Sequence, residues 1–187
     1  MALTVNGTVI PSSGKVICNG TSLDKVNYES TNVWQRGLNL LATNRWTITS
    51  QQDGRIQSSA TYLKVIANAR TDWWNWCVVR TSSALDLRGF TTITITWDNH
   101  GAGTGHTALN WQGWAGFSTN ASLTQRDWGN TNIEYVLHTN THGASGTKAF
   151  SIPSKFRASG VYFYAQRNFY KANGSNTDIT FTKIEIT

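Results

Sequence analysis

Short stretches of strand-forming residues, alternating apolar and polar, run along most of this chain and limit what it can fold into. The clearest stretch is 91–97, where Ile93, Ile95 and Trp97 would share one face and threonines the other. A period of two residues is typical of a β-strand with one buried face. No stretch of a dozen residues has a helical period, and a weak candidate at 38–43 is too short to predict a helix. We therefore expect an all-β protein.

The spacing of these strands predicts the architecture. They are separated by polar turns and cover residues 46–50, 60–67, 74–81, 91–97, 112–117, 133–137, 148–152, 160–166 and 179–186. Many short strands at such spacing favour an antiparallel β-sandwich of the jelly-roll type, which we place at residues 37–187. In the last strand the apolar residues change face midway, which indicates a bulge or a crossing between sheets.

Residues 1–36 have a different character. Asn6-Gly7 and Asn19-Gly20 each lie between strand-forming residues. Such a pair predicts a β-hairpin, because a type I′ turn needs two positive φ angles. A third copy at 26–34 departs from the pattern, with Glu-Ser-Thr where Asn-Gly-Thr would be expected. Isolated hairpins are only marginally stable in water, so this β-ribbon should depend on its own domain, a sister chain or another protein.

The charges, apolar stretches and cysteines argue against nucleic-acid binding, a membrane span and a disulfide. Only 14% of the residues are charged, and the net charge of +6 comes from basic residues scattered along the chain, so we expect no direct binding to nucleic acid. No apolar stretch approaches the ~20 residues of a membrane span, and no signal peptide is expected at the start. Cys18 and Cys77 are expected to be free thiols.

Neither the histidines nor the acidic residues predict a reactive site. The pairs His100/His106 and His138/His142 lack a carboxylate or cysteine at matching spacing, so we interpret them as polar loop residues and expect no metal or cofactor. No nucleophile elbow is present in the sequence. A glycosidase needs two facing carboxylates, and the sequence leaves such a pair open among Asp72, Asp98, Asp127 and Glu134. We expect that the protein is not an enzyme.

The nine tryptophans are the most unusual feature of the composition. Because tryptophan is usually well buried, we expect the core to contain Trp74, Trp76, Trp97 and Trp114. Other tryptophans lie beside amides or charges, and a pyranose ring needs both an aromatic face and hydrogen-bonding groups. We therefore predict a glycan-binding site formed by Trp73, Asn110, Trp111, Gln112, Arg126 and Trp128. The positive charge would favour an anionic polymer such as teichoic acid, bound less tightly as salt rises.

Several motifs carry a resemblance to a known class of protein. The opening contains VNGTVI (5–10), GKV (14–16), NGTSLDKV (19–26) and VW (33–34), and it resembles the N-terminal repeat of structural proteins from phages and prophages of Gram-positive, often gut, bacteria. LDLRGFTTITITW (85–97) and SNTDITFTKI (175–184) resemble strands of their adhesin-like modules. These motifs lie at the start, middle and end of the chain.

The resemblance implies a virion structural protein: a tail fibre, a receptor-binding tip, a capsid decoration or a head fibre. It implies that residues 1–36 attach the protein to other virion proteins, that the chain forms a homotrimer, and that the sandwich at 37–187 faces outward. Such a protein would be made in the cytoplasm of the bacterial host and would reside in the virion.

Three hypotheses follow for the sandwich. In the first it binds a carbohydrate of the host cell surface, which requires an outward-facing tryptophan cluster. In the second it is a purely structural virion subunit without a ligand, with every tryptophan in the core. In the third it is a carbohydrate-active enzyme, which requires facing carboxylates, or a stand-alone carbohydrate-binding module.

Overall fold

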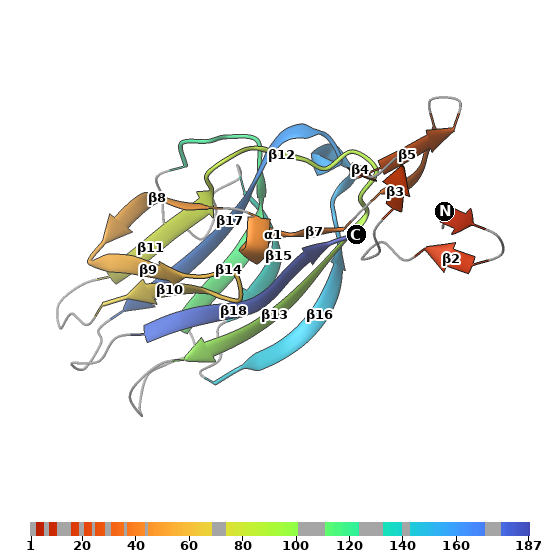
Figure 1. The fold of residues 1–187 in the computed structure, drawn as a ribbon. Helices are drawn as coiled ribbons and strands as arrows, with labels where there is room; N and C mark the ends of the chain where they lie inside the picture. Colours follow the sequence, from red (N-terminus) through yellow and green to blue (C-terminus); the bar gives the residue numbers. More distant parts are fainter. Residues whose placement is uncertain are drawn as a thin grey trace.

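The computed structural model describes residues 3–5, 8–10, 16–18, 21–23, 25–28, 31–35, 37–43, 45–68, 74–100, 111–123, 133–139, 143–170 and 177–187. Two six-stranded antiparallel sheets pack face to face and form a β-sandwich (Figure 1). The expected all-β sandwich of jelly-roll type is therefore confirmed.

The first sheet has the strand order β16-β13-β18-β10-β9, with β7 paired to β18. The bounds of these strands are Ser145–Ser151, Thr92–His100, Thr177–Ile186, Leu63–Ala67, Gly54–Ser58 and Leu38–Asn39, respectively. Strand β9 was not expected from the sequence, because its single large apolar residue, Ile56, gives no visible alternation.

The second sheet has the order β15-β14-β17-β11-β8, with β12 paired to β17. The bounds are Glu134–Thr139, Trp111–Ser118, Ser159–Tyr170, Trp74–Thr81, Trp46–Gln52 and Leu85–Asp86, respectively. Both sheets thus combine segments from distant parts of the chain, which is typical of Greek-key sandwiches.

Two short helices complete the sandwich, α1 (Leu40–Thr43) and the 3₁₀-helix η2 (Ser154–Phe156). Helix α1 lies inside the stretch judged too short to be helical. Asn39 caps it, since its side-chain oxygen accepts hydrogen bonds from the backbone N–H groups of Leu41 (3.1 Å) and Ala42 (3.3 Å). Leu40 and Leu41 are buried in the core, so tertiary packing stabilises this single turn.

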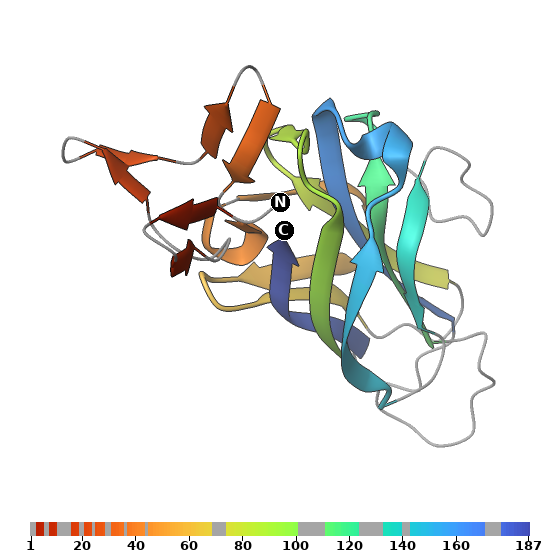
Figure 2. The same ribbon diagram turned by 90° about the vertical axis from the view of Figure 1, so that its right-hand side faces the viewer.

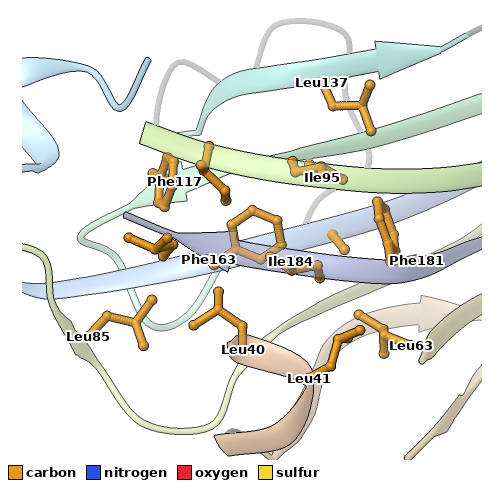
Figure 3. Packing of buried hydrophobic residues seen from close by; sticks show 14 of the residues in the cluster. Leu40, Leu41, Leu63, Leu85, Ile95, Phe117, Leu137, Phe163, Phe181 and Ile184 are labelled. Atoms are coloured by element: carbon orange, nitrogen blue, oxygen red, sulfur yellow. The ribbon is translucent and has the colours of Figure 1, made fainter. Parts of the chain in front are cut away.

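The main hydrophobic core lies between the two sheets. Figure 3 shows side chains from both sheets and from α1 meeting there, among them Phe163 of β17 and Phe181 of β18. Phe163 packs edge-to-face against Phe117 at 5.5 Å between ring centroids. Cys77 is buried in this core as a free thiol, and burial raises its pKa to about 12.

A β-bulge explains the change of face in the last strand. Thr96 pairs with Lys183 and Trp97 pairs with Phe181, which leaves Thr182 without a partner opposite β13. Phe181 and Ile184 are both fully buried, whereas the two residues between them are exposed. The extra residue therefore returns the apolar side chains to the core, and the predicted bulge is confirmed.

The described strands within residues 3–35 form three separate two-stranded antiparallel sheets. They pair β1 (Leu3–Val5) with β2 (Thr8–Ile10), β3 (Val16–Cys18) with β4 (Thr21–Leu23), and β5 (Lys25–Tyr28) with β6 (Thr31–Gln35). All three predicted hairpins are present, the divergent third copy included. In Figures 1 and 2 they lie outside the two large sheets. No helix in the described residues is long and apolar enough to cross a membrane.

Candidate functional site

The structure describes only part of the site predicted from the sequence. Trp73, Asn110, Arg126 and Trp128 lie outside the described residues. Trp111 begins β14, but its side chain is also outside the description. Gln112 follows it and is 1% exposed. That these six residues lie together therefore stays a prediction. Gln112 is the one among them whose side chain the structure describes.

Gln112 belongs to the face of the second sheet that points away from the main core. Side chains alternate along a strand, and Ala115 and Phe117 of β14 point into the core, as does Ala165 of β17. Gln112 and Trp114 of β14 and Gln166 and Asn168 of β17 therefore point outward. These four are nevertheless buried, with exposures of 1%, 6%, 1% and 2% in that order. We call them the amide face.

The strand register places aromatic rings on both sides of the amides. Gln112 lies opposite Asn168, and Asn168 lies opposite Trp76 of β11. Two residues further along these strands, Gln166 of β17 lies opposite Trp114 of β14, and Trp114 lies opposite His138 of β15. Because directly opposite side chains are in contact distance, the amides form a strip between Trp76 on one side and the Trp114–His138 pair on the other.

Some polar side-chain atoms of this strip have no hydrogen-bond partner in the described chain. The side-chain Nε2 of Gln166 donates to Oδ1 of Asn168 at 2.7 Å. The Oε1 of Gln166 and both polar atoms of Gln112 have no hydrogen-bond partner among the described residues. Leaving a buried amide without a hydrogen bond costs roughly 1–3 kcal/mol, and a bound water or a ligand can remove that cost. The amide face is thus suited to a partner that both donates and accepts hydrogen bonds.

The aromatic groups beside the amides are uncharged at neutral pH. The indole of Trp114 stacks on the imidazole of His138, with 5.2 Å between centroids and 11° between planes. Burial lowers the pKa of His138 below its ordinary 6.5, so the ring is mainly neutral at pH 7. Burial also raises the pKa of Tyr135, whose ring lies 5.9 Å from that of Trp114, to about 12.

One end of this outer surface is closed by the chain itself. Leu123 and Ile133 pack on Val78 and Tyr164, forming a second small apolar cluster. The hydroxyl of Tyr164 donates to the carbonyl oxygen of Asn120 at 2.6 Å. These contacts hold residues 119–123 against the sheet, so this end of the outer surface is structural.

The expectations about tryptophan are met in part. Trp114 is buried, as expected, although on the outer face of the second sheet, whereas Trp76 is only half-buried on that face and packs on the small outer cluster. Trp97 does pack against the main core, and the side chain of Trp74 is outside the described residues. Periodicity could not make this distinction, because alternation tells which residues share a face and not which face is covered.

The histidine interpretation needs a similar correction. His100 and His138 were expected in loops, but they lie in β13 and β15. His100 contacts the carboxylates of Asp98 (3.1 Å) and Asp178 (3.5 Å). No group of three or more metal-ligating side chains occurs among the residues that the structure describes.

The acidic residues left open by the sequence do not form a facing pair in the described part of the chain. Asp98 contacts His100, and Glu134 forms an ion pair with Lys155 at 2.5 Å. Asp72 and Asp127 lie outside the described residues.

Comparison with known proteins gives no family and finds distantly similar solved structures. No family model and no curated protein matches the sequence. Among solved structures, the chain resembles CBM27-1 of Caldicellulosiruptor saccharolyticus, determined in complex with mannohexaose, with 9% identity, 80% of this chain and 96% of that chain covered, and a TM-score of 0.46. A family 29 carbohydrate-binding module from Piromyces equi matches with 8% identity, 77% and 90% coverage, and a TM-score of 0.40.

An adhesin domain of the Lys-gingipain of Porphyromonas gingivalis matches with 18% identity, 81% and 90% coverage, and a TM-score of 0.37. An arabinose-bound α-L-arabinofuranosidase also matches, with 12% identity, a TM-score of 0.42, and coverage of 79% of this chain but 23% of that one. At these identities and TM-scores the similarity assigns no family, ligand or activity to this chain.

Proposed function

We propose that the sandwich is a non-catalytic carbohydrate-binding domain whose ligand reaches the amide face by displacing the atoms that bury it in the free chain. The observation that carries the proposal is the buried Gln112 amide, which offers a donor and an acceptor and has no partner among the described residues. A sugar hydroxyl both donates and accepts hydrogen bonds, so it can satisfy such a group.

The aromatic neighbours support the same class of ligand. Trp114 and Trp76 flank the amides, and the apolar CH groups of a sugar ring pack well on an indole while its hydroxyls reach polar side chains. A mostly apolar surface with a few convergent polar groups is the usual composition of a small-ligand site. The sequence-predicted residues Trp73, Asn110, Trp111, Arg126 and Trp128 remain proposed members of this site.

The proposal is tested by binding to a panel of polysaccharides and a glycan array. Gln112→Leu keeps the side-chain volume and removes both hydrogen-bonding atoms, so it should lower the affinity at least about tenfold, the equivalent of one well-made hydrogen bond to a ligand. The matched control is Thr147→Ala, an exposed position on β16 of the other sheet, which should bind as the wild type does. Absence of any carbohydrate ligand for the wild-type protein would refute the proposal.

A role in a phage virion, as a tail fibre, receptor-binding tip or capsid decoration, is a second proposal. Its support is the N-terminal segment, whose three two-stranded sheets pair with no strand of the sandwich sheets in the described chain. Such hairpins need an external surface for stability. A stand-alone carbohydrate-binding module accounts for the sandwich equally well but gives the hairpins no purpose.

Removing residues 1–36 separates these two roles. If the segment attaches the protein to particles, the truncated chain should keep the glycan affinity and thermal stability of the full chain and fail to enter virions of the encoding phage. If the truncated sandwich unfolds instead, the hairpins are part of its fold and the division at residue 36 is wrong.

A further inference from the structure

We infer that the open edge of β16 binds an extended segment of another protein by β-strand addition, and that this segment carries an acidic residue opposite Lys148, between two apolar residues. The edge belongs to the first sheet, so the inference is independent of the amide face. It gives the sandwich a protein partner in addition to the proposed carbohydrate.

The sandwich has one closed side and one open side. On the closed side, β8 leads directly into β9, and a Cβ at Gly54 of β9 would lie 2.6 Å from the Cβ of Cys77 on β11. On the open side, β15 and β16 end their sheets, and no further strand of the described chain pairs with their outer edges (Figure 1). The pairing of β15 with β14 shifts between Ala115 and Gly116, whereas β16 pairs with β13 without a break. Strand β16 is therefore the regular open edge.

The backbone groups on this edge can be assigned residue by residue. Just outside the ends of β16, Ile152 donates its N–H to the carbonyl oxygen of Thr91 at 2.8 Å, and the N–H of Asn99 donates to the carbonyl oxygen of Ala144 at 2.9 Å. In an antiparallel pair, residues that bond to the neighbouring strand alternate with residues that do not. The even-numbered residues of β16 therefore bond to β13, and the odd-numbered residues direct their N–H and C=O groups outward. The outward-facing residues are Ser145, Thr147, Ala149 and Ser151.

These outward-facing groups form a row that an extended chain can match. All four residues are exposed and have short side chains, and no strand among the described residues pairs with this side of them. A peptide that adds a strand to such an edge gains affinity from main-chain hydrogen bonds and specificity from its alternate side chains. The chemistry of the partner can therefore be read from the side chains of β16.

The even-numbered residues of β16 indicate the charge of the partner. Lys148 and Phe150 lie opposite the buried Ile95 and Ile93, so their side chains are on the core side of the sheet. Lys148 is nevertheless exposed, and its Nζ lies 5.3 Å from the centroid of the Phe150 ring. It forms no ion pair within the part of the chain that the structure describes. An acidic residue opposite Lys148 would add a stabilising cross-strand charge pair.

Apolar residues fit on both sides of that acidic residue. Phe150 packs against the main core and is only half-buried. Trp97 is also half-buried, and its ring lies over Gly146, since a Cβ at that glycine would lie 3.3 Å from the indole carbons Cη2 and Cζ2. Apolar side chains opposite Gly146 and Phe150 would cover ring surface that the chain itself leaves partly exposed. The partner segment should thus read apolar, any, acidic, any, apolar.

A second copy of the chain does not have this chemistry. Antiparallel pairing of two β16 strands over their full length is centred on Lys148, so the two lysines would lie directly opposite each other. Like charges in that position are destabilising, and a lysine on an edge strand is a common protection against self-association. Lys148 therefore disfavours its own strand and favours an acidic one.

The test measures binding of the full chain to a fluorescent peptide, Ser-Thr-Val-Thr-Glu-Thr-Val-Thr-Ser, and to two matched peptides. One has lysine in place of glutamate, and the other has methyl groups on the amide nitrogens that would bond to β16. We expect the glutamate peptide to bind about two- to fivefold more tightly than the lysine peptide, the effect of one cross-strand charge pair, and the methylated peptide not to bind. Lys148→Glu should reverse the preference between the two charged peptides.

A proline variant ties the binding to this edge. The N–H of Thr147 faces away from β13, so Thr147→Pro removes no hydrogen bond of the sheet, and proline is tolerated at such edge positions. We expect this variant to keep its fold and to lose the peptide. The matched control is Thr147→Ala, which retains the N–H and should bind as the wild type does.

Two results would overturn the inference. If the wild-type chain binds neither charged peptide, or binds all three peptides equally well, β16 does not accept an acidic strand. If the wild-type chain is a dimer that Thr147→Pro converts to a monomer, a second copy occupies the edge and the assigned partner is wrong.

Discussion

Gln112 is a buried side chain without a hydrogen-bond partner in the described chain, and the proposed binding would explain why it is kept. Its amide is 1% exposed, and neither polar atom has a partner in the described chain. A leucine of similar size would remove the cost of the unsatisfied amide. We expect Gln112→Leu to raise the free energy of unfolding by roughly 1–3 kcal/mol, measured by denaturant titration, while glycan affinity falls. The exposed Gln57 of β9 provides the control, since Gln57→Leu should change neither quantity. A clear loss of stability in Gln112→Leu would mean that the amide serves the fold.

His138 should make the stability of the protein depend on pH. Its ring stacks on Trp114, and partial burial lowers its pKa in the folded state below the ordinary 6.5. As the pH falls below about 6.5, the unfolded chain binds this proton before the folded chain does, so the free energy of unfolding decreases. His138→Phe keeps a ring on Trp114 and removes the titration. We expect the wild type to lose stability relative to this variant between pH 6.5 and the folded pKa, and a parallel pH dependence of the two proteins would contradict the account.

At the level of elements, β14 and β15 approach each other so closely at Gly116 that a residue with a Cβ atom would not fit there. A Cβ at Gly116 would clash with the carbonyl oxygen of Glu134 and would lie 2.8 Å from the Tyr135 Cα, both on β15. A Cβ at Gly113 would meet mainly Cδ1 of Ile179, at 2.6 Å, and that atom is the end of a side chain. Backbone yields less readily than a side chain in a packed interior.

Two alanine substitutions test this difference. We expect Gly116→Ala to cost about 1–3 kcal/mol or more in the free energy of unfolding, because the β14–β15 pairing must shift. Gly113→Ala should cost less, since Ile179 can change rotamer. Thermal and denaturant unfolding of both variants measure the order, and equal costs would show that the two strands can separate at Gly116 without penalty.

The sequence predicts most of the strands, but it does not predict where the residues of the candidate site lie. The strands around Ile93, Ile95 and Phe181 are visible in the sequence because two-residue alternation and a buried face have the same cause. The sequence points to Gln112 only because it lies near Trp111 and Trp114. It does not predict that Gln112 is buried, because a polar residue on the outer face of a sheet normally contacts water. Trp76 is half-buried on the outer face, although its place in the alternation predicts a core residue.

At the scale of the whole molecule, the sandwich is held together by an apolar core and by a polar contact between sheets. Arg167 of β17 is fully buried and donates to Asn99 of β13, to the carbonyl oxygen of His100 (3.2 Å) and to Thr177 of β18 (3.3 Å). Burial lowers its pKa to about 9, so it remains charged at neutral pH. The guanidinium occupies the inner face of β17, while the opposite face of the same strand carries Gln166 and Asn168. One strand therefore supports both the packing of the sheets and the amide face.

The central claim is that a carbohydrate satisfies the amide of Gln112. The most direct measurement is a titration of the ¹⁵N-labelled full chain with a neutral oligosaccharide that binds, followed through the side-chain NH₂ resonances. The Gln112 signal is identified by its absence in Gln112→Leu. The account predicts that this signal shifts in proportion to ligand occupancy, while that of the exposed Gln57 on the other sheet stays fixed. A saturated titration in which the Gln112 signal does not move would contradict the account.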